Sequence, residues 1–496
     1  MAIRLSGLSS GMDTEKMVQD LMKVQRMSYN SISKKKVQME WKKADYYKLY
    51  AEIKKFKEET VFSYKLESTV ISRKATSNNQ DVVTATANAS AANMNHTINV
   101  TQLADGASMT SSASVSVGDK TKLSTQLGIA EGIVDVTIKN GPGPSDTKTI
   151  QVDTSKSIYT LVSQINNAGV NVKANYDATL DRFFLSTTNQ GATAEIDLSS
   201  SSVDGQALLG KLNIDPSTVV TGKNAIFDLD TVVGLEQSSN IFTISDVTYS
   251  LKDLGSTTVN VTSDTEKAIE NVKTFVKAYN ELLAKINSEL KEPRYKGYLP
   301  LTDEEKGDLK ESQILVYEDK ARSGMLRQDS TLSGLVYKMR NDVAASVSGI
   351  TGSYTSFSAI GITTSPNYRE GGTLYVDEIK LRAALEADPE VLGKLFTTDD
   401  GDEDTSSGDG VATRLYNTLK NSMDKLTTEA GFTASASGDE VSNLAKKIHG
   451  YDKQLTNMNR RLKDIEDRYY RQFDAMEKAL SKLNSQGAWL SQQTGG

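Results

Sequence analysis

A chain of 496 residues is too long to fold around one hydrophobic core, so its length predicts about three domains. It has no cysteine and only two histidines, His96 and His449, which excludes disulfides, thiolate nucleophiles and multi-histidine metal sites. The formal net charge of −7 argues against nucleic acid as a partner. No stretch reaches the roughly 18 apolar residues of a membrane span. The first ten residues also lack the apolar run of a cleaved secretory signal.

The N-terminal segment shows the pattern of a long helix with a narrow apolar stripe. Residues 12–66 contain no proline or glycine, and Asp13 or Thr14 can accept a free N–H of the first turn. Apolar side chains follow a heptad spacing at Ile32, Met39, Tyr46, Leu49, Ile53 and Phe56. The same spacing occurs earlier, at Met17, Leu21 and Val24. This pattern predicts a coiled-coil seam.

The middle of the chain has the composition of β-structure. From about Arg73 it is rich in Ser, Thr, Asn, Ala and Val with period-two alternation, which is typical of half-buried strands. The alternation is clearest at Ile98/Val100, Val134/Val136/Ile138, Phe227/Leu229 and Val259/Val261. One short helix is expected inside the block, over 158–165. Residues 73–263 are therefore predicted to be mainly β and to form two small domains.

Helix is expected to return at 264, with a broad apolar face that ends before Pro293. The pattern predicts further helices over 303–323, 330–348, 378–396 and 410–428. A β-hairpin is expected around Gly371-Gly372, with Ile360/Ile362 on one side and Leu374/Val376 on the other.

The last helix has the most regular apolar pattern in the chain. Alternating steps of four and three connect Leu444, Ile448, Tyr451, Leu455, Met458, Leu462, Ile465 and Tyr469, and the stripe continues at Phe473 and Met476. Two adjoining steps of four make a stutter at Phe473, which locally unwinds a supercoil. We expect residues 1–66 and 444–496 to pair in the assembled state, with Ile53, Phe56, Leu455 and Leu462 buried.

Two segments match catalytic or metal-binding patterns only superficially. Residues 7–11 fit G-x-S-x-G, but too few residues precede Ser9 to build the sheet that a hydrolase nucleophile needs. The acidic run 399–404 lacks the glycine and glutamate of an EF-hand loop, because Thr405 and Val411 occupy those positions. We therefore expect neither enzyme activity nor a cofactor, and interpret 399–404 as an acidic surface loop.

Four segments in order resemble the flagellar hook-associated protein 2 family, the filament cap proteins. They are the segment 6–22 with Ser6-Gly7-Leu8-Ser9-Ser10-Gly11-Met12-Asp13-Thr14; the segment 275–282, followed by 300–303 and 327–332; the pair 360–364 and 374–377; and the segment 468–477, ending at 484–486. Residues 153–166 are similar to a motif of flagellar hook-associated proteins. The resemblance covers nearly the whole chain, and the family has no catalytic residues to transfer.

The resemblance implies an α+β multidomain fold: long terminal helices form a coiled-coil or helical-bundle leg, and mainly antiparallel β head domains are inserted between them. The regions expected are a terminal coiled coil, flexible until assembled (1–40 and 455–496), a helical leg domain with a small β-hairpin (41–72 and 264–454), a β head domain (73–115 and 226–263) and a second, inserted β head domain (116–225).

The resemblance also implies an extracellular, flagellar location reached without a cleaved signal peptide. The expected partners are other copies of the chain, most simply in a pentamer, flagellin, hook-associated junction proteins and a cytosolic export chaperone. Two alternatives are a hook–filament junction or flagellin-like subunit, and a surface adhesin whose β domains bind host glycans.

Overall fold

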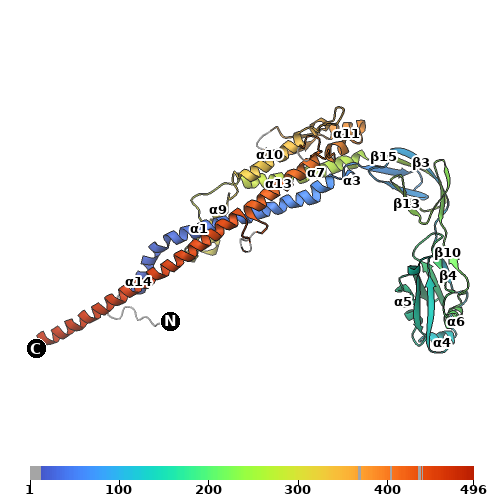
Figure 1. Cartoon of the computed structure of the whole chain (residues 1–496), viewed down its shortest axis with the longest axis horizontal. Helices are drawn as coiled ribbons and strands as arrows, with labels where there is room; N and C mark the ends of the chain where they lie inside the picture. The colour runs from blue at the N-terminus through green and yellow to red at the C-terminus, as the bar shows by residue number, and fades with distance from the viewer. Residues whose placement is uncertain (1–12, 367–369, 403–404, 434–436, 438, 496) are drawn as a thin grey trace. The chain divides into compact units, whose positions relative to one another are not determined.

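The structure, a computed structural model, describes residues 13–495 except 367–369, 403–404, 434–436 and 438. The chain forms two compact units: Met1–Val70 together with Ala268–Gly496, and Ile71–Lys267. The first unit is built from helices and the second mainly from antiparallel strands (Figure 1). The predicted fold class is confirmed. No helix in the described part of the chain is long and apolar enough to cross a membrane.

Helices make up most of the first unit. Their bounds are α1 Thr14–Lys55, α2 Phe62–Tyr64, α3 Glu67–Val70, α7 Thr265–Lys291, α8 Asp303–Gly307, α9 Glu311–Arg322, α10 Ser330–Ala344, α11 Glu378–Ala387, α12 Val391–Phe396, α13 Val411–Ala430 and α14 Asn443–Thr494. A π-helical segment, η1 (Phe56–Val61), joins α1 to α2, and a short 3-10 helix, η3, spans Ser358–Ile360. Asp13 caps α1, because its side chain accepts a hydrogen bond of 2.9 Å from the Lys16 N–H.

The π-helical segment corrects a mismatch between the sequence and a regular helix. After Phe56, a regular helix would direct Thr60 and Ser63 toward the core, but the structure buries Val61 and Tyr64 instead. The wider turn inserts one residue, so that apolar rather than polar side chains face the interior.

Two predicted helices are interrupted, and a third is shorter than expected. The prediction over 378–396 fails at Pro389, because the residue before a proline avoids helical geometry; Asp388 has φ −141° and ψ 95°. The prediction over 303–323 fails at Gly307, where α8 ends before α9 begins. The helix predicted over 330–348 ends at Ala344. The helix predicted to begin at 264 and the helix predicted over 410–428 are present as α7 and α13.

The core of the first unit is aromatic. Rings from η1, α2, α7 and α12 meet there with that of Phe357, which precedes η3; the Phe275 centroid lies 5.1 Å from that of Tyr64 and 5.0 Å from that of Phe396. The predicted hairpin is present beside it, with β16 (Ile362–Thr364) paired to β17 (Leu374–Val376). Ile360, expected on the first strand, belongs to η3.

The second unit contains two separate hydrophobic cores. The first lies between a five-stranded sheet of order β1-β15-β3-β11-β12 and a three-stranded sheet of order β13-β14-β2, both antiparallel. Their bounds are β1 Arg73–Ser77, β2 Val83–Ala87, β3 Met94–Gln102, β11 Ala225–Leu229, β12 Val232–Gln237, β13 Ile241–Ile244, β14 Val247–Leu251 and β15 Gly255–Ser263. The predicted strand pairs Ile98/Val100, Phe227/Leu229 and Val259/Val261 all face this core.

The second core lies among short sheets and three helices. The strands are β4 Ser108–Thr110, β5 Ile133–Lys139, β6 Thr147–Asp153, β7 Val172–Asp177, β8 Arg182–Thr187, β9 Glu195–Ile196 and β10 Val220–Thr221. The helices are α4 Leu123–Leu127, α5 Ile158–Asn166 and α6 Val203–Lys211. Only α5 was expected; α4 is too short to show periodicity.

Helix α6 escaped prediction because it contains two glycines, which disfavour helix. One of them, Gly205, allows the helix to approach β5 closely, since a Cβ there would lie 2.1 Å from the Asp135 carbonyl oxygen.

Candidate functional site

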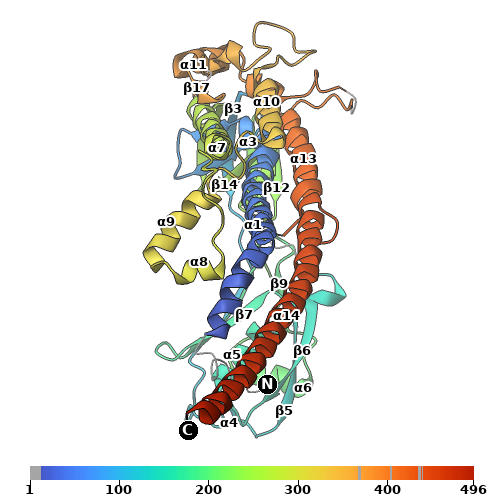
Figure 2. The ribbon, with the colours of Figure 1, turned by 90° about the vertical axis from the view of Figure 1, so that its left-hand side faces the viewer.

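The structure brings the two terminal helices together within one chain. α1 and α14 lie side by side (Figures 1 and 2). Gln25 Nε2 donates to the Tyr469 hydroxyl at 3.4 Å, and Lys36 Nζ lies 2.7 Å from Asp452 Oδ1. Residues later in α1 contact residues earlier in α14, so the two helices are antiparallel.

A buried lysine ties α1 to the point where α14 begins. Lys43 is fully buried, and its Nζ donates to the carbonyl oxygen of Ala430, the last residue of α13, and to Asp439 Oδ2. Asp439 also accepts hydrogen bonds from the N–H groups of Val441 and Ser442, and Ser442 caps α14. A polar residue at a seam position fixes the alignment of paired helices, because a shifted alignment would leave it buried without a partner.

The environment of Asp439 explains how its carboxylate stays ionised beside the lysine. Burial by itself would raise its pKa. Hydrogen bonds from Lys43 Nζ and from the Ser442 and Val441 groups favour the charged form and outweigh burial. Together they hold the pKa of Asp439 well below its usual value.

The apolar contact between α1 and α14 is thin. Val18, Met22 and Leu462 are buried together, with Tyr29, Ile465, Tyr469, Tyr470 and Phe473 packed against them. The expected seam at Met17, Leu21 and Val24 is wrong by one residue: those side chains are 40%, 42% and 61% exposed. The actual seam continues from Val18 and Met22 through Gln25. Because Gln25 is polar, this stripe looks less apolar in the sequence than the neighbouring stripe of Met17, Leu21 and Val24.

The second half of the N-terminal seam has different partners. Tyr46, Leu49, Ile53 and Phe56 are buried, while Ile32 and Met39 are half-buried. The Tyr46 hydroxyl donates to Asp329 at the start of α10, and the Phe56 ring lies 6.5 Å from the rings of Phe275 and Tyr279 on α7. Ile53 and Phe56 are thus already buried within the single chain, where Phe56 packs on the helical core rather than on α14.

The C-terminal seam is buried only at its start. Leu444, Ile448, Leu455 and Leu462 are buried. The other predicted positions are half-buried: Tyr451, Met458, Ile465, Tyr469, Phe473 and Met476. Further along α14, Leu483, Trp489 and Leu490 are 61%, 58% and 53% exposed. The stripe therefore keeps accessible apolar surface along its last third.

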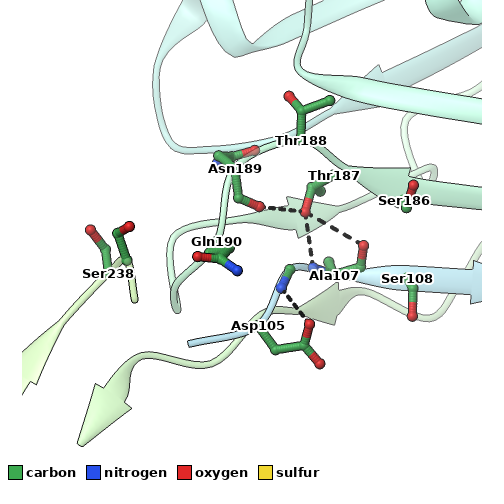
Figure 3. Close-up of a pocket in the computed structure, with 11 residues that line it drawn as sticks. Asp105, Ala107, Ser108, Ser186, Thr187, Thr188, Asn189, Gln190 and Ser238 are labelled. Carbon is green, nitrogen blue, oxygen red and sulfur yellow. Dashed lines mark hydrogen bonds between the residues drawn. The ribbon is translucent and has the colours of Figure 1, made fainter. Parts of the chain in front are cut away.

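A polar pocket of about 540 Å³ lies in the second unit (Figure 3). The Thr187 hydroxyl accepts a hydrogen bond from the Ala107 N–H at 3.0 Å and donates to the Asn189 carbonyl oxygen at 2.8 Å. Asp105, its one ionisable lining residue, accepts from the Gly106 N–H. Within the described lining there is neither a paired nucleophile and base nor an aromatic ring on which a sugar could stack. The acidic loop at 399–402 is exposed, and Ser9 lies outside the described residues.

Sequence reasoning missed the polar members of the α1 seam, above all Lys43 and its partner Asp439. Their signal was present in the spacing. Steps of four and three connect Val18, Met22, Gln25, Tyr29, Ile32, Lys36, Met39, Lys43 and Tyr46 without a break once polar residues are admitted. Asp439 gave no such signal, because it lies in the loop before α14.

Paired terminal helices that carry β domains between them define a structural subunit. Models of the flagellar hook-associated protein 2 N-terminus and C-terminus match residues 10–107 and 222–485. The chain belongs to the flagellar hook-associated protein 2 family, which confirms the resemblance of its four segments.

Individual relatives agree with this assignment. Flagellar hook-associated protein 2 of Halalkalibacterium halodurans is 32% identical, with 99% of each chain covered. The Escherichia coli K12 protein of the same name is 27% identical, with 98% of this chain and 97% of that protein covered. The crystal structure of the D1-D2-D3 domains of the E. coli flagellar cap protein FliD has the same fold, with a TM-score of 0.56 at 24% identity. It covers 82% of this chain and 99% of that one.

Proposed function

We propose that the protein is a structural cap at the distal end of the bacterial flagellar filament, where an oligomer of it promotes the folding and insertion of flagellin. Family membership supports the cap role. The observation that supports the mode of attachment is the half-buried stripe of α14, from Ile465 to Met476, together with the exposed apolar side chains beyond it. Apolar surface of this kind on a long helix favours further helical partners.

The proposal includes a division of the chain into regions. Residues 1–40 and 455–496 form the terminal coiled coil that becomes ordered on assembly, and 41–72 with 264–454 form the leg domain. Two head domains were expected at 73–115 with 226–263 and at 116–225, but the cores shift both bounds: Ala107, Met109 and Val115 pack in the second core, and Ala225 packs in the first. The two separate cores of the second unit support two head domains, and the shared aromatic core supports one leg domain.

The proposal includes partners and a route. The copies close into a ring, most simply a pentamer, that contacts flagellin and hook-associated junction proteins. A cytosolic chaperone keeps the chain competent for export, which needs no cleaved signal peptide. Such a subunit has no enzyme activity.

The experiment replaces the half-buried Met476 and Leu480 with aspartate and measures attachment to filament ends and motility of a strain that lacks its cap. Lys478→Asp is the matched control, because Lys478 is exposed on the same helix. We expect the double variant to fold normally by circular dichroism and to lose attachment, while the control retains it. A double variant that attaches and restores motility would show that this stripe is not the anchor.

A further inference from the structure

A pocket of about 690 Å³ in the first unit is lined by cations. It lies between α1, the segment that follows α7 and the turn between α9 and α10. Lys42, Arg294, Lys296 and Arg327 line it, and no carboxylate belongs to the described lining. Four cations around one hollow are unexpected in a chain of net charge −7. The composition of the pocket points to an anionic ligand.

Two of the cations are held in place by backbone groups. Arg294 Nη1 donates to the carbonyl oxygens of Ala321 and Ser323 at 2.7 and 2.8 Å. Arg327 Nη1 donates to those of Lys291 and Glu292 at 3.2 and 3.1 Å. In the described part of the chain, Nε and Nη2 of both arginines make no hydrogen bond, so each guanidinium keeps one edge for a carboxylate. Because the arginines are already ordered, binding an anion costs less conformational entropy.

The two lysines are also weakly neutralised. Lys42 Nζ lies 3.6 Å from Asp329 Oδ2. Asp329, however, already accepts hydrogen bonds from the Tyr46 hydroxyl and from the N–H groups of Thr331 and Leu332. Lys296 is exposed and forms no ion pair with any residue that the structure describes.

The same unit carries a segment of opposite charge. Asp399, Asp400 and Asp402 follow α12 and are exposed. Asp399 lies 3.9 Å from Lys65 Nζ. Burial raises the pKa of the neighbouring Asp409; a hydrogen bond from the Asp400 backbone opposes this, and the charges of Asp399 and Asp400 add to it. A cationic partner would relieve the repulsion between these carboxylates.

The loop cannot reach the pocket of its own chain. Lys65, beside Asp399, follows the end of the continuous helix that contains Lys42, and the helical rise places the two lysines roughly 30–35 Å apart. Complementary surfaces at two different places on one body form a heterologous contact between copies, and repetition of that contact closes a ring when the rotation allows it.

We propose that the acidic loop 399–402 of one copy docks in the cationic pocket of the next copy, formed by Lys42, Arg294, Lys296 and Arg327. This inference rests on the proposed oligomeric cap and specifies one contact within it. Carboxylates of the loop pair with the free guanidinium edges and with Lys296. Screening by salt weakens the contact, because both surfaces are solvent-accessible.

The test compares full-length chains in which one of the two surfaces has reversed charge. The pocket variant is K296E/R327E and the loop variant is D400K/D402K. The matched control is K277E/K420E, two exposed lysines outside the pocket. Sedimentation velocity gives the self-association constant. We expect each surface variant to associate about tenfold more weakly or worse, and the control to match wild type. Combining all four substitutions in one chain should restore association, because the reversed loop then meets a pocket of reversed charge.

Surface variants that associate like wild type, or a combined variant that stays dissociated, would overturn the proposal. A second measurement is independent of a folding defect. The chain has no cysteine, so K296C/D402C should form intermolecular disulfides on oxidation, whereas absence of cross-linked species would refute the contact. Attachment to filament ends separates the hypothesis of this contact from the hypothesis that the protein is a filament cap. If surface variants assemble and attach like wild type, the cap function stands and the contact is wrong; if wild type neither self-associates nor attaches, both fail.

Discussion

Replacing Lys43 with alanine is expected to lower the free energy of unfolding of the helical unit by about 3 kcal/mol. The ammonium group is fully buried between Ala430 and Asp439, so the variant leaves a largely buried carboxylate without its cation and a carbonyl oxygen without its donor. Removing one partner of a buried ion pair costs roughly 3–5 kcal/mol. We expect the lower end, because Asp439 retains the hydrogen bonds from Val441 and Ser442.

The assay is urea unfolding followed by fluorescence of Trp41, which lies two residues before Lys43. Trp489→Phe removes the other tryptophan, which is 58% exposed at the end of α14. Lys54→Ala is the matched control on the same helix. Its side chain is 53% exposed and lies 4.0 Å from Glu58, so the change should stay within about 0.5 kcal/mol.

A double replacement, Lys43→Met with Asp439→Leu, tests whether the loss comes from the uncompensated charge. It should recover much of the stability, because neither partner is then left buried alone. The reasoning would be refuted if Lys43→Ala unfolded at the same urea concentration as Lys54→Ala, or if the double replacement were as unstable as the sum of the single ones.

Three further predictions concern the α1–α14 pair, the packing of α6 and the pH dependence of the Lys43–Asp439 pair. Leu462→Ala should destabilise the α1–α14 pair by about 2 kcal/mol, the low end for a buried leucine, because the cluster around it is thin. Leu483 is exposed on the same helix, so Leu483→Ala should change the stability little. Protease sensitivity of α14 measures both effects. Gly205→Ala should loosen α6 from β5, because the added methyl group meets the Asp135 carbonyl oxygen, and the thermal transition of the β unit should fall by several degrees while that of the helical unit is unchanged. The Lys43–Asp439 pair should contribute its full stability above about pH 5. That contribution should be lost as the pH falls from the unfolded-state pKa of Asp439, roughly 3.9, toward its lower folded-state pKa. Acid should therefore narrow the stability difference between wild type and Lys43→Ala in urea titrations.

Regular periodicity made the long elements predictable from the sequence. The broad apolar face of α7 and the alternation of β3, β11 and β15 each face the core that their spacing indicated, and the heptad steps of α14 gave a single long helix. These patterns suffice because many residues together determine which face of a helix or strand is buried, so one atypical residue does not change which face that is.

Local exceptions were not predictable to the same degree. Gln25, Lys36 and Lys43 occupy seam positions in α1, so an apolar search shifted the early seam by one residue. The π-helical turn at Phe56–Val61 depends on the packing of Val61 and Tyr64 against other helices, which single-sequence spacing does not contain. The cationic pocket joins residues from three segments that lie far apart in the sequence, so no single segment indicates it.

The measurement that tests the central claim most directly is hydrogen–deuterium exchange of the full chain, free and bound to filament ends. The account predicts that amides of α14 from about 465 to 494, where the apolar stripe is accessible in the single chain, become protected on binding. Buried positions such as Leu444 and Ile448 should be protected in both states. Unchanged exchange along the end of α14, with new protection confined to the β unit, would contradict the assignment of the paired terminal helices as the part that engages the filament.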